Sequence, residues 1–216
     1  YFVSEEAGKI TAVATDSKRL SLASIRIAND VKIDEGIIVP LKTIHEIIRL
    51  LSNYGTCLFY PGQTQCFFKI GDTEVVSRVV DGQFPNYRQV IPLEHRIIAT
   101  ASTSKIIESL RRVMVFTREP SYKVILNFKK NVLKIEARTQ DLGEADEEMP
   151  ITIEGDDSIV VGMSAQYLLD SLKEIDTDDV AISLTSQVSP VVIIPAGDDS
   201  SKSVVMPIQI KSDQSE

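Results

Sequence analysis

Few side chains of this chain are arranged for covalent chemistry. Its only histidines, His45 and His95, lie far apart in the sequence, and its only cysteines are Cys57 and Cys66. Most enzymes need a nucleophile beside a base, or a cluster of metal ligands. The sequence contains no phosphate-binding glycine loop, no G-x-S-x-G motif and no Cys-x-x-Cys motif. It therefore predicts a protein that catalyses no reaction and holds no cofactor.

Acidic residues are concentrated in one segment of the second half. Positions 141–157 hold eight acids and no base, namely Asp141, Glu144, Asp146, Glu147, Glu148, Glu154, Asp156 and Asp157. Carboxylate oxygens are good ligands for divalent cations, so a metal-dependent hydrolase is a distant alternative. The segment lacks the D-x-[DN]-x-[DN]-G spacing of a calcium loop. We therefore expect a solvated acidic surface and no metal site.

The size and composition are those of an ordinary globular protein. The 216 residues suffice for one large domain or two of ordinary size. No apolar run approaches the roughly 20 residues of a membrane span, and no signal peptide is visible. Two cysteines in an otherwise cysteine-poor chain are typical of a reducing compartment. We expect a cytoplasmic protein with free thiols, although Cys57 and Cys66 lie on neighbouring expected strands and could face each other.

Helical periodicity marks three segments, Lys42–Asn53, Lys105–Phe116 and Gln166–Ile175. In each of them apolar side chains recur three and four positions apart, which predicts a helix with one buried face. Pro40 suits the first turn of the first helix, because proline lacks the N–H that this turn leaves unpaired. Ser164 is expected to cap the third helix.

Almost all of the remaining chain reads as short strands in which apolar and polar residues alternate. About three strands follow each helix, which indicates a repeated unit of one helix and three strands. The stretch Pro190–Pro195 is apolar throughout, as expected for a strand covered on both faces. This order predicts an α+β fold made of repeated helix-plus-antiparallel-strand units.

The repeats divide the chain into two expected domains, 1–92 and 93–216. The first ends in a connector that reads "VVDGQFPNYRQVIP" at Val79–Pro92. Linkers between domains are usually small and polar, whereas this one carries Phe84, Pro85 and Tyr87. We therefore expect the connector to be packed and to form part of a surface.

Positive charge collects on the helices although the net charge is −8. The polar stripe of the first helix includes Lys42 and Arg49, and that of the second includes Lys105, Arg111 and Arg112. Such stripes are often no more than solvated surface. Together with the acidic segment, however, they indicate one face directed towards a polyanion and one acidic edge.

Five segments in register carry a resemblance to a known family. They are "VATDSKRL" (Val13–Leu20), "VVDGQFPNYRQVIP" (Val79–Pro92), "SAQYLLDSLKEI" (Ser164–Ile175), "SPVVI" (Ser189–Ile193) and "VVMPI" (Val204–Ile208). In this order they resemble the bacterial DNA sliding clamp, the beta subunit of DNA polymerase III. The resemblance covers nearly the whole chain and matches most of the family's second domain and all of its third. We therefore interpret the chain as a piece of a longer protein.

The resemblance implies the DNA-clamp fold, with helices on one face and sheets on the other, and a processivity factor that encircles duplex DNA. Lys42, Arg49, Lys105, Arg111 and Arg112 would then face phosphates without reading sequence. The resemblance also implies a head-to-tail homodimer that is associated with the nucleoid. The acidic edge would belong to the dimer interface, through Asp141, Glu144 and Glu147. We expect this piece not to close a ring by itself. A clamp-like binding module that never encircles DNA is the alternative.

The resemblance also implies a groove for short hydrophobic peptides of polymerases, clamp-loader subunits and repair proteins. The matching positions are Thr15, Lys18, Arg19, Leu20, Pro85, Val90, Tyr167, Val188, Pro190, Val204, Met206, Pro207 and Ile208. For Leu20, Val188 and Val204 alone, core packing is the simpler explanation. The chain departs from the family pattern at Ser17 and Gln89, and the tail Lys211–Glu216 extends past the usual end.

Overall fold

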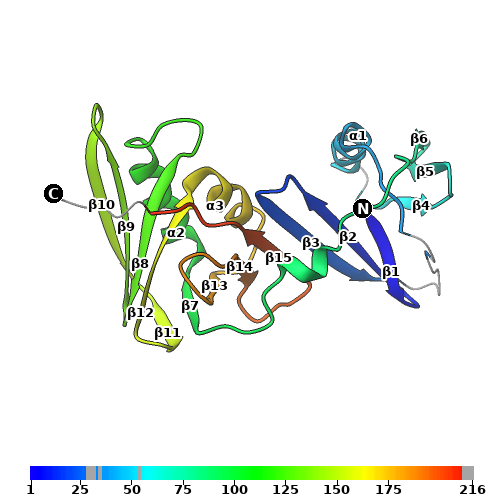
Figure 1. Ribbon diagram of the computed structural model, residues 1–216. Coiled ribbons are helices and arrows are strands. Elements are labelled where there is room, and N and C mark those ends of the chain that lie inside the picture. The colour runs from blue at the N-terminus through cyan, green and yellow to red at the C-terminus, as the bar shows by residue number, and fades with distance from the viewer. Residues whose placement is uncertain (28–32, 34–35, 53–54, 211–216) are drawn as a thin grey trace. The chain divides into compact units, whose positions relative to one another are not determined.

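The structure is a computed structural model of the 216-residue chain, and it describes all residues except 28–32, 34–35, 53–54 and 211–216. The chain divides into two compact units. Figure 1 labels their helices and strands along the ribbon. The first unit comprises Tyr1–Ala14 and Leu22–Asn86, and the second comprises Thr15–Ser21 and Tyr87–Glu216. Each unit is described by itself.

In its described residues, the first unit contains one helix and two groups of antiparallel strands. Its elements are β1 (Phe2–Glu6), β2 (Lys9–Thr15), β3 (Arg19–Arg26), α1 (Leu41–Leu51), β4 (Leu58–Tyr60), β5 (Gln65–Ile70) and β6 (Thr73–Arg78). The last residue of β2 and the first three residues of β3 fall within Thr15–Ser21 and therefore belong to the second unit. The strands β1, β2 and β3 are neighbours in that order, and β4, β5 and β6 form a three-stranded sheet. The first expected helix is therefore present, with bounds shifted by one or two residues.

The core of the first unit lies between α1 and the sheet β4-β5-β6. Alternate residues of β5 are buried, and these include Phe68 and Ile70. Ile47 of α1 belongs to the same cluster. Pro40 was expected inside the first helical turn but stands just before it, with an extended ψ of 139°. Its carbonyl accepts the N–H groups of Thr43 and Ile44, which explains why the helix starts directly after it.

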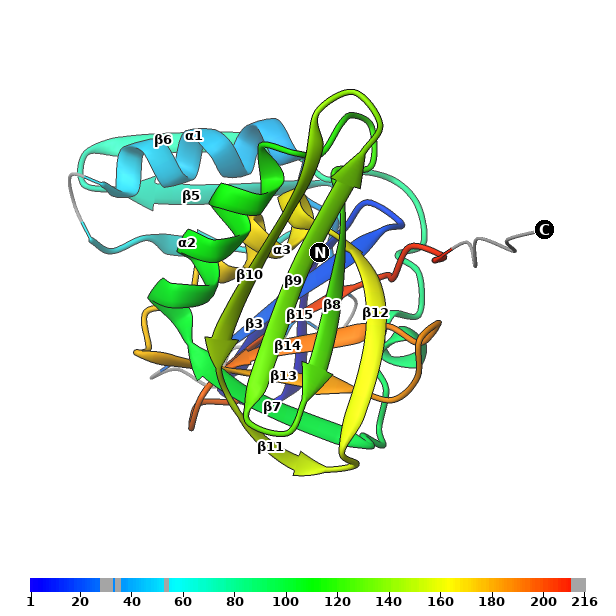
Figure 2. The ribbon, with the colours of Figure 1, turned by 90° about the vertical axis from the view of Figure 1, so that its left-hand side faces the viewer.

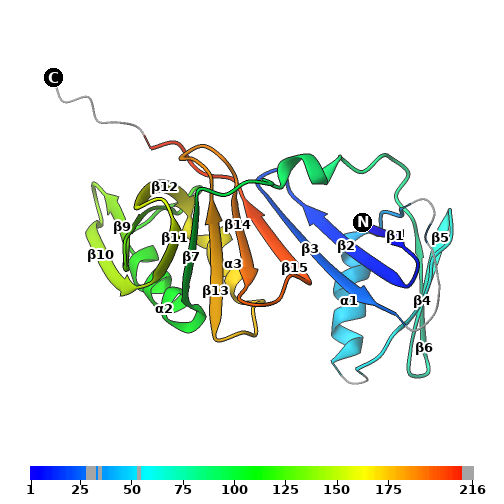
Figure 3. The same ribbon diagram turned by 90° about the horizontal axis from the view of Figure 1, so that it is seen from below.

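Up to Ile210, the second unit has two α-helices, one short 3-10 helix and two groups of antiparallel strands. Its elements are η1 (Tyr87–Val90), β7 (Ile97–Ser102), α2 (Thr103–Met114), β8 (Lys123–Lys129), β9 (Val132–Thr139), β10 (Gly143–Pro150), β11 (Thr152–Gly155), β12 (Ser158–Ser164), α3 (Ala165–Leu172), β13 (Asp179–Leu184), β14 (Val191–Pro195) and β15 (Ser201–Val205). One sheet has the order β10-β9-β8-β12, as Figure 2 shows. In the other, β15-β14-β13-β7-β11, the first four strands run side by side in Figure 3.

A single core joins both sheets and both helices of the second unit. It includes Leu110 of α2, Phe128 of β8, Leu168 of α3 and Ile182 of β13, all of which are almost fully buried. The strand β14 is buried on both faces, as its apolar sequence predicted. Ser164 caps α3 by accepting the N–H of Tyr167 at 3.4 Å, which confirms the expected cap.

The expected unit of one helix and three strands is correct after α1 and α3 but wrong after α2. Four strands, β8 to β11, lie between α2 and β12, the strand that leads into α3, whereas three strands, β4 to β6, lie between α1 and β7, the strand that leads into α2. The missed strand is β10, in which only Met149 is buried. Strand β10 lies at the edge of its sheet and half of its residues are acidic, so it shows no apolar alternation. The sequence of Met149–Gly155 alternates like a single strand, but the structure divides this stretch between β10 and β11, which belong to different sheets.

The connector and the cysteines agree with their expected environments. The Phe84 ring stacks on the Tyr1 ring at 4.5 Å, so this part of the connector is packed within the first unit. Cys57 and Cys66 are free thiols, and burial raises the pKa of both. Cys66 pairs with Ser77 in the strand register rather than with Cys57. Among the described residues, no helix is long and apolar enough to cross a membrane.

Candidate functional site

A tight turn between β2 and β3 carries the first group of expected groove residues. The Asp16 carboxylate accepts the backbone N–H groups of Lys18 and Arg19, both at 3.0 Å. The Thr15 hydroxyl donates to the Arg19 carbonyl at 2.8 Å, and Ser17 has a positive φ of 70°. Burial would raise the pKa of Asp16, but these hydrogen bonds outweigh it and hold the pKa below its usual value. Side-chain and backbone hydrogen bonds thus stabilise the turn.

The Arg19 side chain attaches this turn to α3. Its Nη1 donates to the Asp170 carboxylate at 2.6 Å, and its Nε donates to Asp16 at 3.0 Å. Its guanidinium carbon lies 4.6 Å from the ring centroid of Tyr167, which is the geometry of a cation–π contact. Arg19 and Tyr167, two of the residues expected in the groove, are thus in contact.

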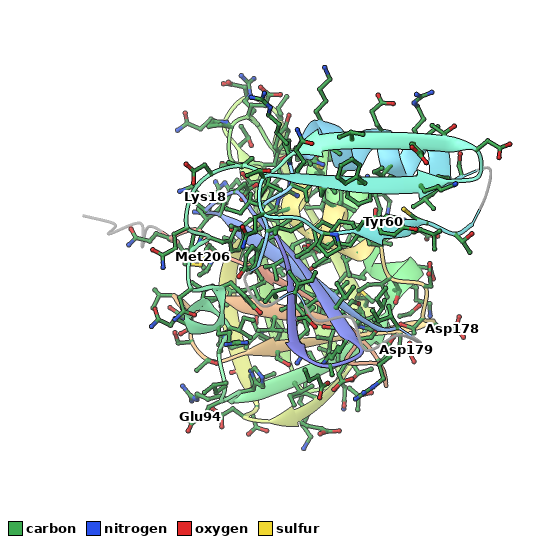
Figure 4. All side chains as sticks on the ribbon, turned by 90° about the vertical axis from the view of Figure 1, so that its right-hand side faces the viewer. Lys18, Tyr60, Glu94, Asp178, Asp179 and Met206 are labelled. Atoms are coloured by element: carbon green, nitrogen blue, oxygen red, sulfur yellow. The ribbon has the colours of Figure 1, made fainter. Side chains whose placement is uncertain are left out.

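The C-terminal segment Met206–Ile210 is attached at three points. The Met206 N–H donates to the Lys18 carbonyl at 2.9 Å, and Figure 4 shows these two residues side by side. The Ile208 N–H donates to the Gly162 carbonyl at 2.7 Å. The Lys123 ammonium group donates to the Gln209 carbonyl at 3.1 Å. Met206 is therefore held beside the turn that carries Arg19.

The loop between β13 and β14 presents a second apolar residue. The Ser186 hydroxyl accepts the N–H groups of Val188 at 3.3 Å and of Ser189 at 3.1 Å. This arrangement leaves Val188 70% exposed. Val191, the first residue of β14, pairs with Val205, the last residue of β15. The end of this loop and Met206, which follows Val205, therefore lie at the same end of this strand pair.

The expected groove residues differ in how far solvent reaches them. Leu20 and Val204 are only 5% and 2% exposed and lie in the protein interior. The accessible apolar residues are Val90, Val188 and Met206, and Thr15 and Lys18 are exposed polar residues. The half-buried members are Arg19, Tyr167, Pro190, Pro207 and Ile208. Pro85 is exposed and belongs to the first unit, whereas the other twelve residues belong to the second.

Sequence reasoning missed the residues that hold this site in place. Asp16 shapes the turn, Asp170 binds Arg19, and Gly162 and Lys123 hold the C-terminal segment. The one usable signal was on α3, where Asp170 lies three positions after Tyr167 and hence on the same helical face. The other contacts join residues from distant parts of the sequence.

Both units match one protein family. Residues 88–209 match the family described as DNA polymerase III beta subunit, C-terminal domain, and residues 2–86 match the family described as its central domain. This chain belongs to the DNA polymerase III beta subunit family. The two matched ranges meet close to the boundary between the two units, which falls after Asn86.

Individual beta subunits resemble the chain over nearly all of its length. The beta sliding clamp of Synechococcus elongatus is 31% identical over 205 residues, covering 92% of this chain and 54% of that protein. The beta sliding clamp of Caulobacter vibrioides is 30% identical over 203 residues. The crystal structure of the beta subunit of Pseudomonas aeruginosa superposes with a TM-score of 0.90 at 28% identity, covering 97% of this chain and 58% of that one. The chain thus spans about half the length of its relatives and has the expected DNA-clamp fold.

The basic residues of this beta-subunit chain are not equally available. On α2, Arg112 makes a two-pronged ion pair with Glu147 of β10, at 2.7 and 2.9 Å. On α1, Arg49 pairs with Glu46 at 2.7 Å. Lys42, Lys105 and Arg111 are exposed and make no ion pair within the described part of the chain.

The acidic edge expected for the dimer also has partners within the chain. Asp141 pairs with Arg118 at 3.1 Å, and Glu144 lies 3.8 Å from Arg138. Glu147 accepts from Arg112, and this hydrogen bond lowers the pKa of Glu147. Two expected roles, DNA contact for Arg112 and dimer contact for Glu147, therefore fall on one ion pair.

Proposed function

We propose that this chain forms the central and C-terminal domains, 1–92 and 93–216, of a sliding clamp that keeps a DNA polymerase on its template. The observation that carries the proposal is the family match of both units over residues 2–86 and 88–209. A clamp acts by encircling duplex DNA and tethering partners at high effective concentration, and it performs no covalent chemistry. Its place of work is the cytoplasm, at the nucleoid.

The surface around Met206 is proposed to bind short hydrophobic peptides of polymerases and clamp-loader subunits. It combines accessible apolar groups, Met206 and Val188, with the ordered turn that carries Lys18 and Arg19. A methionine suits such a site because its unbranched side chain adapts to different ligands. The structure of a related sliding clamp, from Pseudomonas aeruginosa, was determined bound to griselimycin, so at least one clamp of this family binds a ligand.

Met206→Ala is expected to weaken binding of a polymerase-derived clamp-binding peptide by roughly 1–3 kcal/mol, because it removes apolar contact area from the site. Fluorescence anisotropy with a labelled peptide measures this change directly. Leu20 is unsuitable for the same experiment, since truncating a side chain that is 5% exposed would also open a cavity.

Leu142→Ala is the matched control for the Met206 experiment. Leu142 is 41% exposed and Met206 is 39% exposed, and both belong to the second unit. The Leu142 variant and Asp146→Ala on β10 should bind the peptide as the wild type does. Equal affinity of the wild type and a folded Met206 variant would place the peptide site elsewhere.

The proposed contact with DNA predicts unequal roles for two neighbouring arginines. Arg111→Ala should reduce the slope of log affinity against log salt by about 1 for a short duplex, as the loss of one phosphate contact does. Arg112→Ala should reduce that slope less, because Glu147 already neutralises Arg112. Titrations at several salt concentrations measure both slopes.

Glu147→Gln completes this comparison by removing the competing carboxylate. In that background Arg112→Ala should reduce the slope as much as Arg111→Ala does. Equal slopes for the two single arginine variants in the wild-type background would contradict the assigned difference.

Homodimer formation through β10 is the remaining part of the proposal, and it concerns the full-length protein. Strand β10 is at the edge of its sheet, so its outer backbone groups are open to a partner strand. Asp141, Glu144 and Glu147 would exchange their partners within the chain for basic residues of the other subunit. The alternative, a binding module that does not encircle DNA, has no separate support in the structure.

A further inference from the structure

Asp170 contacts Arg19 of the proposed peptide site and is not one of the apolar residues of that site. Its Oδ2 accepts from Arg19 at 2.6 Å, while its Oδ1 accepts from the Gln166 amide at 2.7 Å. Both carboxylate oxygens are therefore engaged. Gln166 lies one helical turn earlier on α3, so it fixes the direction of the carboxylate.

The helix that carries Asp170 is itself well anchored. Ser164 caps its first turn, and the Ser171 hydroxyl donates to the Tyr167 carbonyl at 3.0 Å. Leu168, Leu169 and Leu172 are buried in the core of the second unit. Asp170 thus presents its charge from a rigid support.

Arg19 links α3 to the turn at 16–19. Its guanidinium lies between the carboxylates of Asp16 and Asp170 and over the ring of Tyr167. The Lys18 carbonyl of the same turn accepts the Met206 N–H. Asp170 is therefore connected through Arg19 to the backbone that holds Met206.

We propose that Asp170 is a positioning residue of the peptide site: it holds Arg19 over Tyr167 and so keeps the turn at 16–19 against α3. This inference rests on the proposed peptide-binding function. Arg19 would then contribute to the shape of the peptide site and would not bind a carboxylate of the ligand, because it is already paired with the carboxylates of Asp16 and Asp170. Asp170 acts only through Arg19.

A double-mutant cycle tests this dependence. The variants are Asp170→Asn, Arg19→Ala and the combination of both, and the probe is a labelled clamp-binding peptide from a DNA polymerase. Asp170→Asn should weaken binding by about two- to fivefold, the range expected for a partly exposed ion pair. In the Arg19→Ala background the same change should have no effect, because the interaction it removes is already absent. Thermal unfolding confirms that each variant is folded.

Glu174→Gln is the matched control, since Glu174 is an exposed carboxylate two residues after the end of α3. It should leave peptide affinity unchanged. An equal loss on Asp170→Asn in both Arg19 backgrounds would overturn the inference, because Asp170 would then act independently of Arg19. So would an Asp170→Asn variant that binds as tightly as the wild type.

A second measurement does not depend on peptide binding. The Nε–H resonance of Arg19 in a ¹H–¹⁵N spectrum reports its position over the Tyr167 ring. It should shift in Asp170→Asn and stay in place in Glu174→Gln, and an unchanged resonance in Asp170→Asn would refute the hold on Arg19. If the wild-type chain binds no peptide, the proposed function is contradicted. The Arg19 resonance still tests whether Asp170 holds Arg19 in place.

Discussion

Gly162→Ala is expected to displace the C-terminal segment Met206–Ile210 from β12. A Cβ atom at position 162 would lie 2.4 Å from the Ile208 carbonyl oxygen and 3.1 Å from a side-chain carbon of Ile210. The first distance is far below a van der Waals contact, and it involves backbone that cannot rotate away. The hydrogen bond from the Ile208 N–H to the Gly162 carbonyl would be lost or distorted.

This displacement should affect both stability and binding. Forcing an extra methyl group into a packed contact costs roughly 1–3 kcal/mol in the free energy of unfolding. Peptide binding should weaken at least as much as in Met206→Ala, because Met206 moves together with Pro207 and Ile208. Chemical denaturation and fluorescence anisotropy measure the two effects.

Ser158→Ala is the control for this experiment. Ser158 is an exposed residue at the start of the same strand, where it pairs with Lys129. Its replacement should change neither stability nor affinity by more than about 0.5 kcal/mol. A Gly162→Ala variant with wild-type peptide affinity would show that the attachment at Gly162 does not position the site.

Leu110→Ala should produce the largest loss of stability. Leu110 is fully buried on α2, in the core that joins both helices and both sheets of the second unit. Truncation removes apolar contact and leaves a cavity, which costs about 2–5 kcal/mol. Urea denaturation followed by circular dichroism measures this, and the transition of the second unit should move to lower urea.

The same change at an exposed leucine separates burial from residue type. Leu93 is 94% exposed, so Leu93→Ala should alter the free energy of unfolding by less than about 0.5 kcal/mol. Similar losses for the two variants would contradict the position of Leu110 in the core. Since the chain has two units, their transitions have to be followed separately.

The helices could be predicted because their signal is local. In α2 the buried residues Ile106, Leu110 and Val113 recur three and four positions apart, which is the period of a helix. Strand β9 likewise alternates between buried and half-buried residues. Strand β10 could not be found this way, since an acidic strand at a sheet edge has little apolar face to bury.

Burial of the expected groove residues could not be judged from their types. Leu20, Val188 and Val204 are all branched apolar residues, yet Val188 is exposed at a turn built by Ser186 while the other two are buried. The difference comes from strand pairing, because Val204 lies within the sheet opposite Val192. Strand pairing depends on residues that are distant in the sequence, so the burial of a single apolar residue cannot be predicted from its type.

By itself the sequence determined the fold class, the three helices and the resemblance to the clamp family, because periodicity and short motifs are read from neighbouring residues. Only the tertiary structure decided which charges are available. It joins Arg112 to Glu147, and it joins Arg19 to Asp170 across 151 positions of the chain. An ion pair forms when folding brings two side chains within a few ångströms of each other, and the spacing of those residues along the chain does not encode that distance.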